Sequence, residues 1–375
     1  MLQSVVINGR FLAKSPTGVQ RVARELLLAI DHQRANDPRA AQSSWTLLTP
    51  PDAEKLDLKS MDQRAIGQGS GNLWEQRDLP RNLGANALLL NLCNVGPLMV
   101  RDHVLTIHDL QTRTNPSSYS RAFRAWYAVS QAILVRRAKR VVTVSDYSRR
   151  QIVEAFPQSA QKVITVKNGT DHALAPVSDP SILAAHGLRP GGYLLSFASA
   201  QPHKNMQVLV DAFCAEDRGE TKLALIGAKE MSDPPKGPGI VHLPRVADDA
   251  LLALYENAVL LAVPSLTEGF GLPPGEALWR GCPSLVADAG ALPEIYQDLA
   301  LCLPPTDVSK WSDAISDVLS GAVELSHRAP EALTWANAAK AYLEIVDEIF
   351  AEHLAPRKSA YDLSAKPVRE GDQTA

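Results

Sequence analysis

Residues 258–283 read AVLLAVPSLTEGFGLPPGEALWRGCP, and this stretch indicates the fold of the second half of the chain. Its apolar beginning, 258–263, predicts a buried strand, because short runs of Val and Leu bounded by proline are typical of parallel sheets. Pro273 and Pro274 then begin a helix that ends at Gly281. No Ser, Thr, Asp or Asn stands in the capping position, so we expect the first helical N–H groups to remain available to an anion.

The same alternation of apolar runs and helical patterns extends over most of the chain. Strands are predicted at 3–8, 44–49, 86–91, 103–108, 140–145 and 162–167, and then at 193–199, 221–227, 240–243, 258–263, 284–287 and 299–303. Helices are predicted at 17–31, 117–138, 146–156, 204–216, 248–257, 273–280 and 306–320. This alternation predicts an α/β protein with two doubly wound, Rossmann-like domains that face each other across a cleft.

Proline and glycine interrupt the pattern between 173 and 192, which is where we place the break between the domains. The expected units are a first domain at 1–175 and a second at 190–330. A closing helix at 331–353 is expected to return toward the first domain. Residues 357–375 are polar and without periodicity, so a disordered tail is expected there.

The composition is that of a globular protein, with 45% hydrophobic and 21% charged residues. A net charge of −3 offers no general attraction for nucleic acid, so no such partner is expected. The four cysteines are scattered without a C-x-x-C pair, which fits a reducing cytoplasm. No apolar run reaches the roughly 18 residues of a membrane span, and no signal-peptide pattern precedes the first strand. Membrane contact is therefore expected to be peripheral only.

Two carboxylates, Glu268 and Glu276, flank the loop and helix start of the opening stretch. Beside a phosphate they would repel it, unless they reach past it to hydroxyl groups that donate hydrogen bonds. We therefore predict Glu268 at the hydroxyls of a sugar and Glu276 at a ribose. The alternative for Glu276 is a solvent-facing residue that complements the helix dipole. Gly269 and Gly271 would let the backbone approach the ligand closely.

A family resemblance is carried by Leu251-Leu-Ala-Leu-Tyr, by the run from Pro264 to Pro274, by Ala291-Leu-Pro-Glu294 and by two glutamates separated by seven residues. These motifs resemble the large GT-B glycosyltransferase family usually numbered family 4, and the similarity starts at Thr17-Gly-Val-Gln20. It implies a bacterial, mannosyltransferase-like enzyme that is retaining and metal-independent. Such an enzyme moves a hexose from a nucleotide-sugar to a glycan or lipid-diphosphate-linked acceptor in cell-surface polysaccharide biosynthesis.

The resemblance also assigns roles to residues outside the motif. Lys204 would neutralise the departing diphosphate, and Gly18 would give its N–H to it or would only begin an ordinary helix. His108 would lie against the donor sugar, and the alternative is a histidine satisfied by a neighbouring carbonyl. His203 stands where the family usually carries Arg or Lys. Either it weakens the binding of the diphosphate or makes that binding depend on pH, or it is a plain surface histidine. The predicted catalytic residues are His108, Lys204 and Glu268. The predicted donor-binding residues are Gly18, Ser199, His203, Lys204, Val246, Asp248, Glu268, Gly269, Phe270, Gly271, Leu272 and Glu276.

The donor base is predicted from Asp248, which precedes an apolar-periodic helix and would cap it. By resemblance this region, with Val246, lies against the base, where a carboxylate would accept the paired N–H donors of guanine. GDP-mannose is therefore the predicted donor, and a UDP-sugar is the alternative. No Asp-x-Asp pair follows a strand, so no metal is expected, and no cofactor beyond the nucleotide-sugar co-substrate. The alternative of another class is a non-catalytic protein that binds sugar nucleotides.

The first domain is expected to carry the acceptor side. Runs seen in a subset of the family, Trp74-Glu-Gln76 and 91–97, are placed on that surface, and Ser145 is expected to cap a helix. Residues 101–150 hold ten Lys/Arg against three Asp, together with three aromatic residues in one helix. The pattern favours a solvated basic face with the aromatic rings in the core. The alternative is that this excess meets anionic lipid on the inner face of the membrane.

Overall fold

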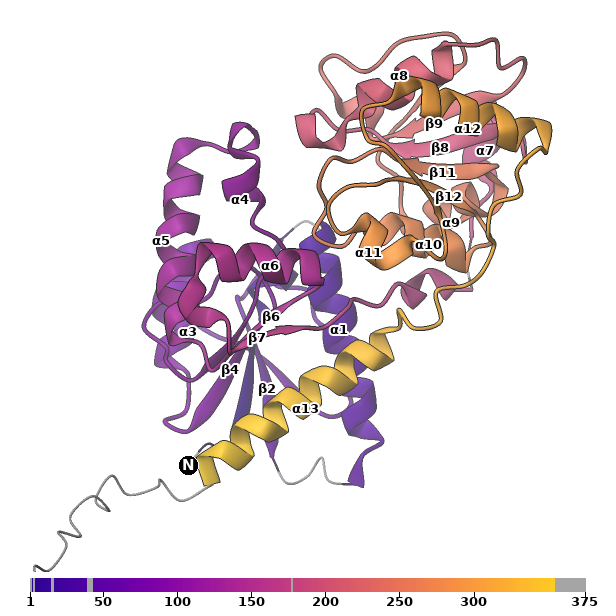
Figure 1. The fold of residues 1–375 in the computed structure, drawn as a ribbon. Coiled ribbons are helices and arrows are strands. Elements are labelled where there is room, and N and C mark those ends of the chain that lie inside the picture. Colours follow the sequence, from indigo (N-terminus) through magenta and orange to yellow (C-terminus); the bar gives the residue numbers. More distant parts are fainter. Residues whose placement is uncertain (1, 3, 15–16, 39–42, 177, 355–375) are drawn as a thin grey trace, which may run out of the picture.

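A computed structural model gives the structure of the chain, and it describes residues 2, 4–14, 17–38, 43–176 and 178–354. Two parallel sheets lie in two domains, which confirms the expected α/β fold of Rossmann-like domains facing each other (Figure 1). The tail predicted at 357–375 lies outside the described residues.

The first sheet has seven parallel strands in the order β3-β2-β1-β4-β5-β6-β7. Its strands are β1 (Ser4–Asn8), β2 (Ser44–Thr49), β3 (Asp62–Ala65), β4 (Ala87–Asn91), β5 (His103–Thr106), β6 (Arg140–Thr143) and β7 (Val163–Thr165). Ile7 pairs with Leu47 on one side and with Leu90 on the other. The winding direction reverses between β1 and β4, and the carboxyl ends of strands at such a point are where α/β folds bind ligands.

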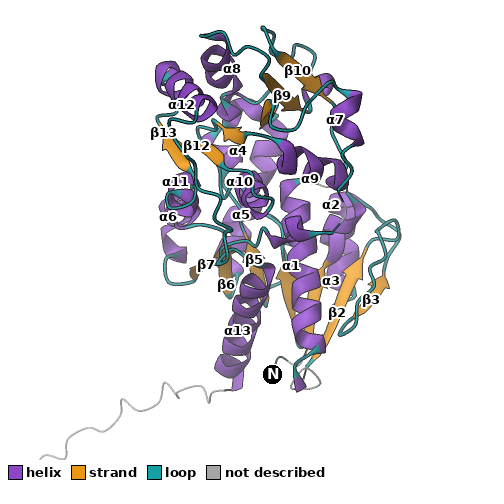
Figure 2. Ribbon diagram, turned by 90° about the vertical axis from the view of Figure 1, so that its right-hand side faces the viewer, coloured by secondary structure: helices purple, strands orange, loops and turns teal. Residues whose placement is uncertain are grey.

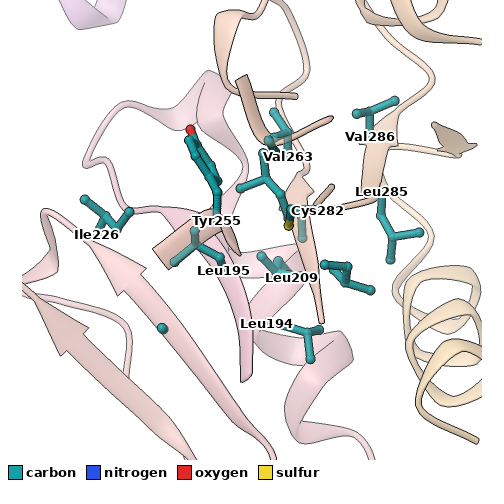
Figure 3. Close-up of a cluster of buried hydrophobic side chains, with 14 of the residues drawn as sticks. Leu194, Leu195, Leu209, Ile226, Tyr255, Val263, Cys282, Leu285 and Val286 are labelled. Atoms are coloured by element: carbon teal, nitrogen blue, oxygen red, sulfur yellow. The ribbon is translucent and has the colours of Figure 1, made fainter. Parts of the chain in front are cut away.

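The second sheet has six parallel strands in the order β10-β9-β8-β11-β12-β13, with its reversal between β8 and β11. Its strands are β8 (Tyr193–Phe197), β9 (Lys222–Ile226), β10 (Ile240–Leu243), β11 (Leu260–Val263), β12 (Ser284–Ala287) and β13 (Leu301–Leu303). Apolar side chains from β8, β11 and β12 pack with Tyr255 into the core of this domain (Figure 3).

The long helices lie close to their predicted positions. The helices are α1 (Gly18–Ala35), α2 (Gly71–Leu73), α3 (Leu79–Arg81), α4 (Gln111–Thr114), α5 (Arg121–Arg137), α6 (Asp146–Ala155), α7 (Ser181–Ala185), α8 (Met206–Cys214), α9 (Asp248–Asn257), α10 (Leu272–Trp279), α11 (Leu292–Tyr296), α12 (Val308–Ser320) and α13 (Trp335–Leu354). Short turns of 3-10 helix are η1 (Gly9–Ala13), η4 (Pro116–Ser118), η5 (Pro157–Ser159), η6 (Asp171–Leu174), η7 (Pro202–Lys204) and η8 (Ala228–Glu230), and η3 (Trp74–Asp78) is a π-helix. Strand β3 was not predicted, because its sequence DQRA has no apolar pattern and three of its four residues are exposed.

Helix α13 belongs structurally to the first domain. It lies beside α1 (Figures 1 and 2), and Trp335, Tyr342 and Ile349 enter the core that α1 and the first sheet form. The Tyr342 hydroxyl lies 2.8 Å from Thr106 Oγ1 of β5, which ties the helix to the sheet. None of the described helices has the length and apolar character needed to cross a membrane.

The two connections between the domains run side by side. The backbone N–H of Thr170 donates to the Leu333 carbonyl at 2.9 Å. Gly169 packs against Trp335 so closely that a Cβ atom at Gly169 would lie 2.1 Å from the Trp335 nitrogen. The outgoing and returning segments therefore form one paired hinge.

Candidate active site

A cavity of about 410 Å³ lies between the domains, at the carboxyl ends of β8 and β11. We call it the donor cavity. Most of the predicted site residues line it: Gly18, His108, Ser199, Lys204, Glu268, Gly269, Phe270, Gly271, Leu272 and Glu276. Three predicted donor-binding residues, His203, Val246 and Asp248, are not among its lining residues.

Lys204 and Glu268 form an ion pair inside the donor cavity. The Lys204 Nζ donates to Glu268 Oε1 at 2.7 Å, and the two side chains are 32% and 15% exposed. Asn205 follows Lys204 in a left-handed conformation, and its Nδ2 donates to the carbonyls of Pro264 and Pro305 at 3.0 and 2.6 Å. These bonds hold the turn that carries Lys204 against the loop after β11. A cation and a carboxylate thus lie side by side on two joined loops.

The start of α10 is uncapped, as predicted, but it offers few donors. Gly271 is the N-cap residue at φ +82°, a conformation that favours glycine, and no side chain caps the helix. Pro273 and Pro274 have no N–H, so Leu272 and Gly275 alone keep one in the first turn. The Gly275 N–H faces the Tyr296 hydroxyl. The expectation of several free N–H groups at this helix was therefore wrong.

Helix α1 offers the better anion site. It begins at Gly18, its N-cap residue Thr17 makes no side-chain capping bond, and Gly18 and Val19 line the donor cavity. A helix of 18 residues presents unpaired N–H groups and the positive end of its dipole at this point. An anion in the cavity would therefore be held between the start of α1 and Lys204.

Glu276 is buried rather than solvent-facing, so that alternative was wrong. It is 6% exposed, and its two oxygens accept from His172 Nε2 at 2.9 Å and from the Tyr255 hydroxyl at 3.0 Å. Burial raises the pKa of Glu276, but the interactions of its carboxylate with His172, Arg21 and Tyr255 outweigh burial and lower the pKa. The carboxylate is therefore ionised and is held in one orientation.

His172 connects Glu276 to the hinge. The indole Nε1 of Trp335 donates to His172 Nδ1 at 3.1 Å. An indole N–H can only donate, so Nδ1 accepts from Trp335, and Nε2 is the ring nitrogen that donates to Glu276. Nothing in the sequence around His172 marked it, because its partners lie more than 100 residues away.

His108 follows β5 at the wall of the donor cavity and is 5% exposed. Its Nε2 lies 2.9 Å from the Leu92 carbonyl, and its backbone N–H donates to Asn94 Oδ1 at 2.7 Å. Burial lowers the pKa of His108 to about 4. The ring is therefore neutral, with Nε2 donating to Leu92 and Nδ1 left as an acceptor.

Gly269 brings the donor loop onto the first domain. A Cβ atom there would lie 2.5 Å from the His108 carbonyl oxygen, and the Gly269 carbonyl accepts from Ser145 Oγ at 2.6 Å. Gly269 lines the donor cavity, so its expected role of letting a ligand approach stays a prediction, and its missing side chain also makes room for the first domain. Ser145 also accepts from the Ser148 N–H at 3.1 Å and so caps α6, as predicted.

The three residues outside the cavity have other contacts. Asp248 is the first residue of α9 and not its cap, because the N-cap residue is Ala247. Its side chain is 66% exposed and forms an ion pair with Arg21 of α1. Val246 packs against the core of the second domain. His203 is 5% exposed, which excludes the interpretation as a plain surface histidine.

Comparison with known proteins gives two family matches. Residues 83–174 match the model described as "Glycosyltransferase Family 4", and residues 185–334 match "Glycosyl transferases group 1". The two matches together span more than half of the chain. No group of three or more His, Cys, Asp or Glu side chains that could hold a metal ion occurs among the described residues.

Individual relatives are similar at modest identity. An O-antigen chain mannosyltransferase B of Escherichia coli is 31% identical over 228 residues, which are 57% of this chain and 59% of that protein. The aligned part is thus less than two thirds of that relative. An O-antigen chain mannosyltransferase of Salmonella typhimurium is 22% identical over 335 residues, 84% of this chain and 90% of that protein. A solved sucrose-phosphate synthase from Thermosynechococcus elongatus has the same fold, with a TM-score of 0.68 at 16% identity over 94% of this chain and 100% of that one.

Proposed function

This chain belongs to the group 1, family 4 glycosyltransferases, and we propose that it is a retaining enzyme that transfers mannose from GDP-mannose. The proposed acceptor is a glycan or a lipid-diphosphate-linked glycan in cell-surface polysaccharide biosynthesis. Relatives named as O-antigen chain mannosyltransferases support the choice of sugar and of polysaccharide.

The pair of Lys204 and Glu268 at 2.7 Å is the observation that carries the proposal. A departing diphosphate needs positive charge that is already in place, and Lys204 with the uncapped start of α1 supplies it. Glu268, freed from part of its contact with Lys204, accepts from hydroxyls of the mannose. These groups replace a metal in the proposed reaction, and no cofactor takes part.

The transfer takes place on one face of the sugar. The oxygen of the acceptor hydroxyl bonds to the anomeric carbon from the side on which the diphosphate leaves. The bond between that carbon and the phosphate oxygen breaks, and its electron pair stays on the phosphate. The hydroxyl proton passes to a phosphate oxygen, so the configuration is retained without a covalent intermediate. His108 Nδ1, a neutral acceptor at the cavity wall, receives a hydrogen bond from a mannose hydroxyl.

The nucleoside lies farther along the second domain in this proposal. Glu276, fixed by His172 and Tyr255, accepts from the ribose hydroxyls. For guanine to donate its paired N–H groups to Asp248, the base must replace Arg21, which holds that carboxylate in the structure. A UDP-sugar is the alternative donor, because uracil does not need this exchange.

A thermal-shift experiment with nucleoside diphosphates and their sugars tests the proposal. A ligand at 100 times its dissociation constant stabilises the folded state by about 2.7 kcal/mol. GDP and GDP-mannose are expected to raise the melting temperature, and GDP is expected to inhibit turnover. Inhibition by UDP and not by GDP would assign the UDP-sugar alternative. Binding of sugar nucleotides without any transfer or hydrolysis would instead favour the non-catalytic alternative.

The proposed place of the reaction is the cytoplasmic face of the membrane. Part of the basic stretch 101–150 is neutralised within the protein, since Arg140 pairs with Glu352 and Lys139 with Asp102. Arg136 and Arg137, at the end of α5, remain exposed to solvent. Arg137 contacts the Leu98 carbonyl, next to Met99, which is 75% exposed. This basic and apolar surface is the part of the stretch that we propose to meet anionic lipid.

A further inference from the structure

Arg21 joins the two domains at the wall of the donor cavity. It lies in the first turn of α1 and lines the cavity. Its Nη1 donates to Asp248 Oδ2 at 3.1 Å, and its Nη2 donates to the other oxygen of that carboxylate. The charge of Arg21 also interacts with the carboxylate of Glu276. The guanidinium is thus engaged with both carboxylates that are proposed to bind the nucleoside.

The side chain of Arg21 is rooted beside the anion site at the start of α1. The Arg21 N–H donates to the Thr17 carbonyl at 2.9 Å, which is the first hydrogen bond of the helix. The N–H groups of residues 18–20 therefore have no partner within the helix. Side chains of an α-helix lean toward its N-terminus, so the stem of Arg21 extends over this first turn. An anion at the helix start would lie close to the path of this side chain.

The donor cavity offers few cations to a diphosphate. Among the described residues that line it, Lys204 and Arg21 are the only lysine and arginine, and His108 is neutral. Lys204 is already paired with Glu268 at 2.7 Å. A departing diphosphate carries more than one negative charge, so Lys204 alone does not balance it. Arg21 is the further cation that the described lining can supply.

The bond between Arg21 and Asp248 is one that the protein can give up easily. The Asp248 side chain is 66% exposed, whereas that of Arg21 is 24% exposed. Water solvates such an exposed carboxylate when its partner leaves, and exposed ion pairs contribute little to stability. A guanidinium binds phosphate through the same paired N–H groups that it uses for a carboxylate. A diphosphate held at the start of α1 would therefore compete well for Arg21.

We propose that Arg21 is a donor-binding residue that changes partner: a guanine base that binds Asp248 releases Arg21, which then binds the departing diphosphate. This proposal rests on the proposed function, in which guanine replaces Arg21 on Asp248. Recognition of the base thereby delivers the second cation that stabilises the leaving group. A base that does not bind Asp248 leaves Arg21 on that carboxylate, and Lys204 with the start of α1 then holds the diphosphate alone. The choice of base is thus made partly at the diphosphate.

Equilibrium titrations of the full chain with GDP, guanosine and inorganic pyrophosphate test the proposal. Arg21→Gln is expected to raise the Kd of GDP about tenfold or more, because the variant loses charge-assisted hydrogen bonds to phosphate. The same variant is expected not to raise the Kd of guanosine, because the base no longer competes with Arg21 for Asp248. Arg24→Gln is the matched control, because Arg24 lies on the same helix, pairs with Glu54 and does not line the cavity.

Pyrophosphate reports on Arg21 without any base. Asp248→Asn loosens the hold on Arg21, so it is expected to lower the Kd of pyrophosphate by about two- to fivefold, the range of an exposed ion pair. Asp249→Asn is the matched control. It removes the same charge from the first turn of the same helix, and Asp249 does not line the cavity. Melting temperatures close to that of the wild type show that the variants are folded.

Two kinds of result would overturn the proposal. One is a Kd of GDP that does not rise in Arg21→Gln, or that rises by the same factor as the Kd of guanosine. The other is an equal Kd of pyrophosphate in Asp248→Asn and Asp249→Asn. Failure of the proposed function has a different signature, because then GDP does not bind the wild-type protein. The pyrophosphate titrations still decide in that case whether Arg21 moves from Asp248 to an anion.

Discussion

The carboxylate of Glu294, in the second domain, lies 2.7 Å from the backbone nitrogen of Asp146, in the first. Its other oxygen accepts from the Tyr147 N–H, also at 2.7 Å. These are the first two residues of α6, so a carboxylate of one domain occupies the helix N-terminus of the other. Together with the Ser145 bond to Gly269, this contact links the two domains across the cleft.

Replacing Glu294 with Ala should open the cleft. Hydrogen bonds to a charged group contribute about 1.5–3 kcal/mol each, and Glu294→Ala removes the two that Asp146 and Tyr147 donate. We expect a larger radius of gyration in X-ray scattering and faster amide exchange at Asp146 and Tyr147. Glu331→Ala, at an exposed position before α13, is the control. Unchanged exchange at both amides would show that the contact does not hold the domains together.

Replacing Lys204 with Met should lower kcat by about 10²–10³-fold, because the variant loses the cation that stabilises charge on the departing diphosphate. The melting temperature should change little, since Lys204 is 32% exposed. Turnover of the nucleotide-sugar under saturating donor measures the effect. Lys229→Met, which alters an exposed lysine in η8, serves as the control. A Lys204→Met variant with more than a tenth of the wild-type kcat would contradict the assigned role.

Replacing Trp335 with Phe should weaken donor binding without removing the packing of the ring. The variant loses the indole N–H that fixes His172, and one hydrogen bond of about 1 kcal/mol corresponds to a roughly fivefold higher dissociation constant. Trp311→Phe is a matched control, because its indole donates to the Pro304 carbonyl inside the core of the second domain. His172→Gln keeps a donor and an acceptor and should bind the donor better than His172→Ala. Equal donor affinity in the Trp335→Phe and Trp311→Phe variants would show that the bond from Trp335 to His172 does not contribute to donor binding.

The stability of the protein should fall as pH drops from about 6.5 toward 4. Burial lowers the pKa of His103 and that of His108 to about 4. Between the unfolded value, about 6.5, and the folded value, the unfolded chain binds more protons, so stability decreases as pH falls. Each histidine should remove about 2 kcal/mol between pH 7 and pH 5. His103→Gln should flatten the dependence of melting temperature on pH, whereas His353→Gln, at an exposed position, should not. An equally steep dependence after His103→Gln would contradict this account.

Replacing Arg136 and Arg137 with Gln should reduce sedimentation with vesicles that contain anionic phosphatidylglycerol. Each basic residue near such a surface contributes about 1 kcal/mol, so the pair should change the partition coefficient by roughly tenfold or more. Arg189→Gln, in the second domain and paired with Glu220 at the surface, is the control. Failure of the wild-type protein to sediment with these vesicles would contradict the proposed membrane contact.

Local patterns predicted the elements of the fold and the position of the donor cavity. Apolar runs such as Leu260–Val263 and the prolines that begin α10 are signals carried by neighbouring residues, and they led to Glu268 and Glu276. Local patterns could not predict which side chains bind Glu268 and Glu276, because those partners are far away in the sequence. His172 reaches Glu276 across 104 residues, and only the folded hinge brings the two together. For Asp248 a local pattern was itself in error. The pattern correctly predicted a helix start at this place, but Ala247 is the N-cap residue and Asp248 is the first residue of the helix.

The return of α13 to the first domain has a consequence for synthesis on the ribosome. The core around α1 takes in Trp335 and Ile349, which are translated after every strand of the second domain. The second domain is continuous in the chain and can complete its core before α13 emerges. The face of the first domain that α13 will cover therefore stays exposed to water until α13 is synthesised. At common elongation rates this interval lasts about 10 s or more. During translation this face is where a chaperone that binds apolar surface would be most needed.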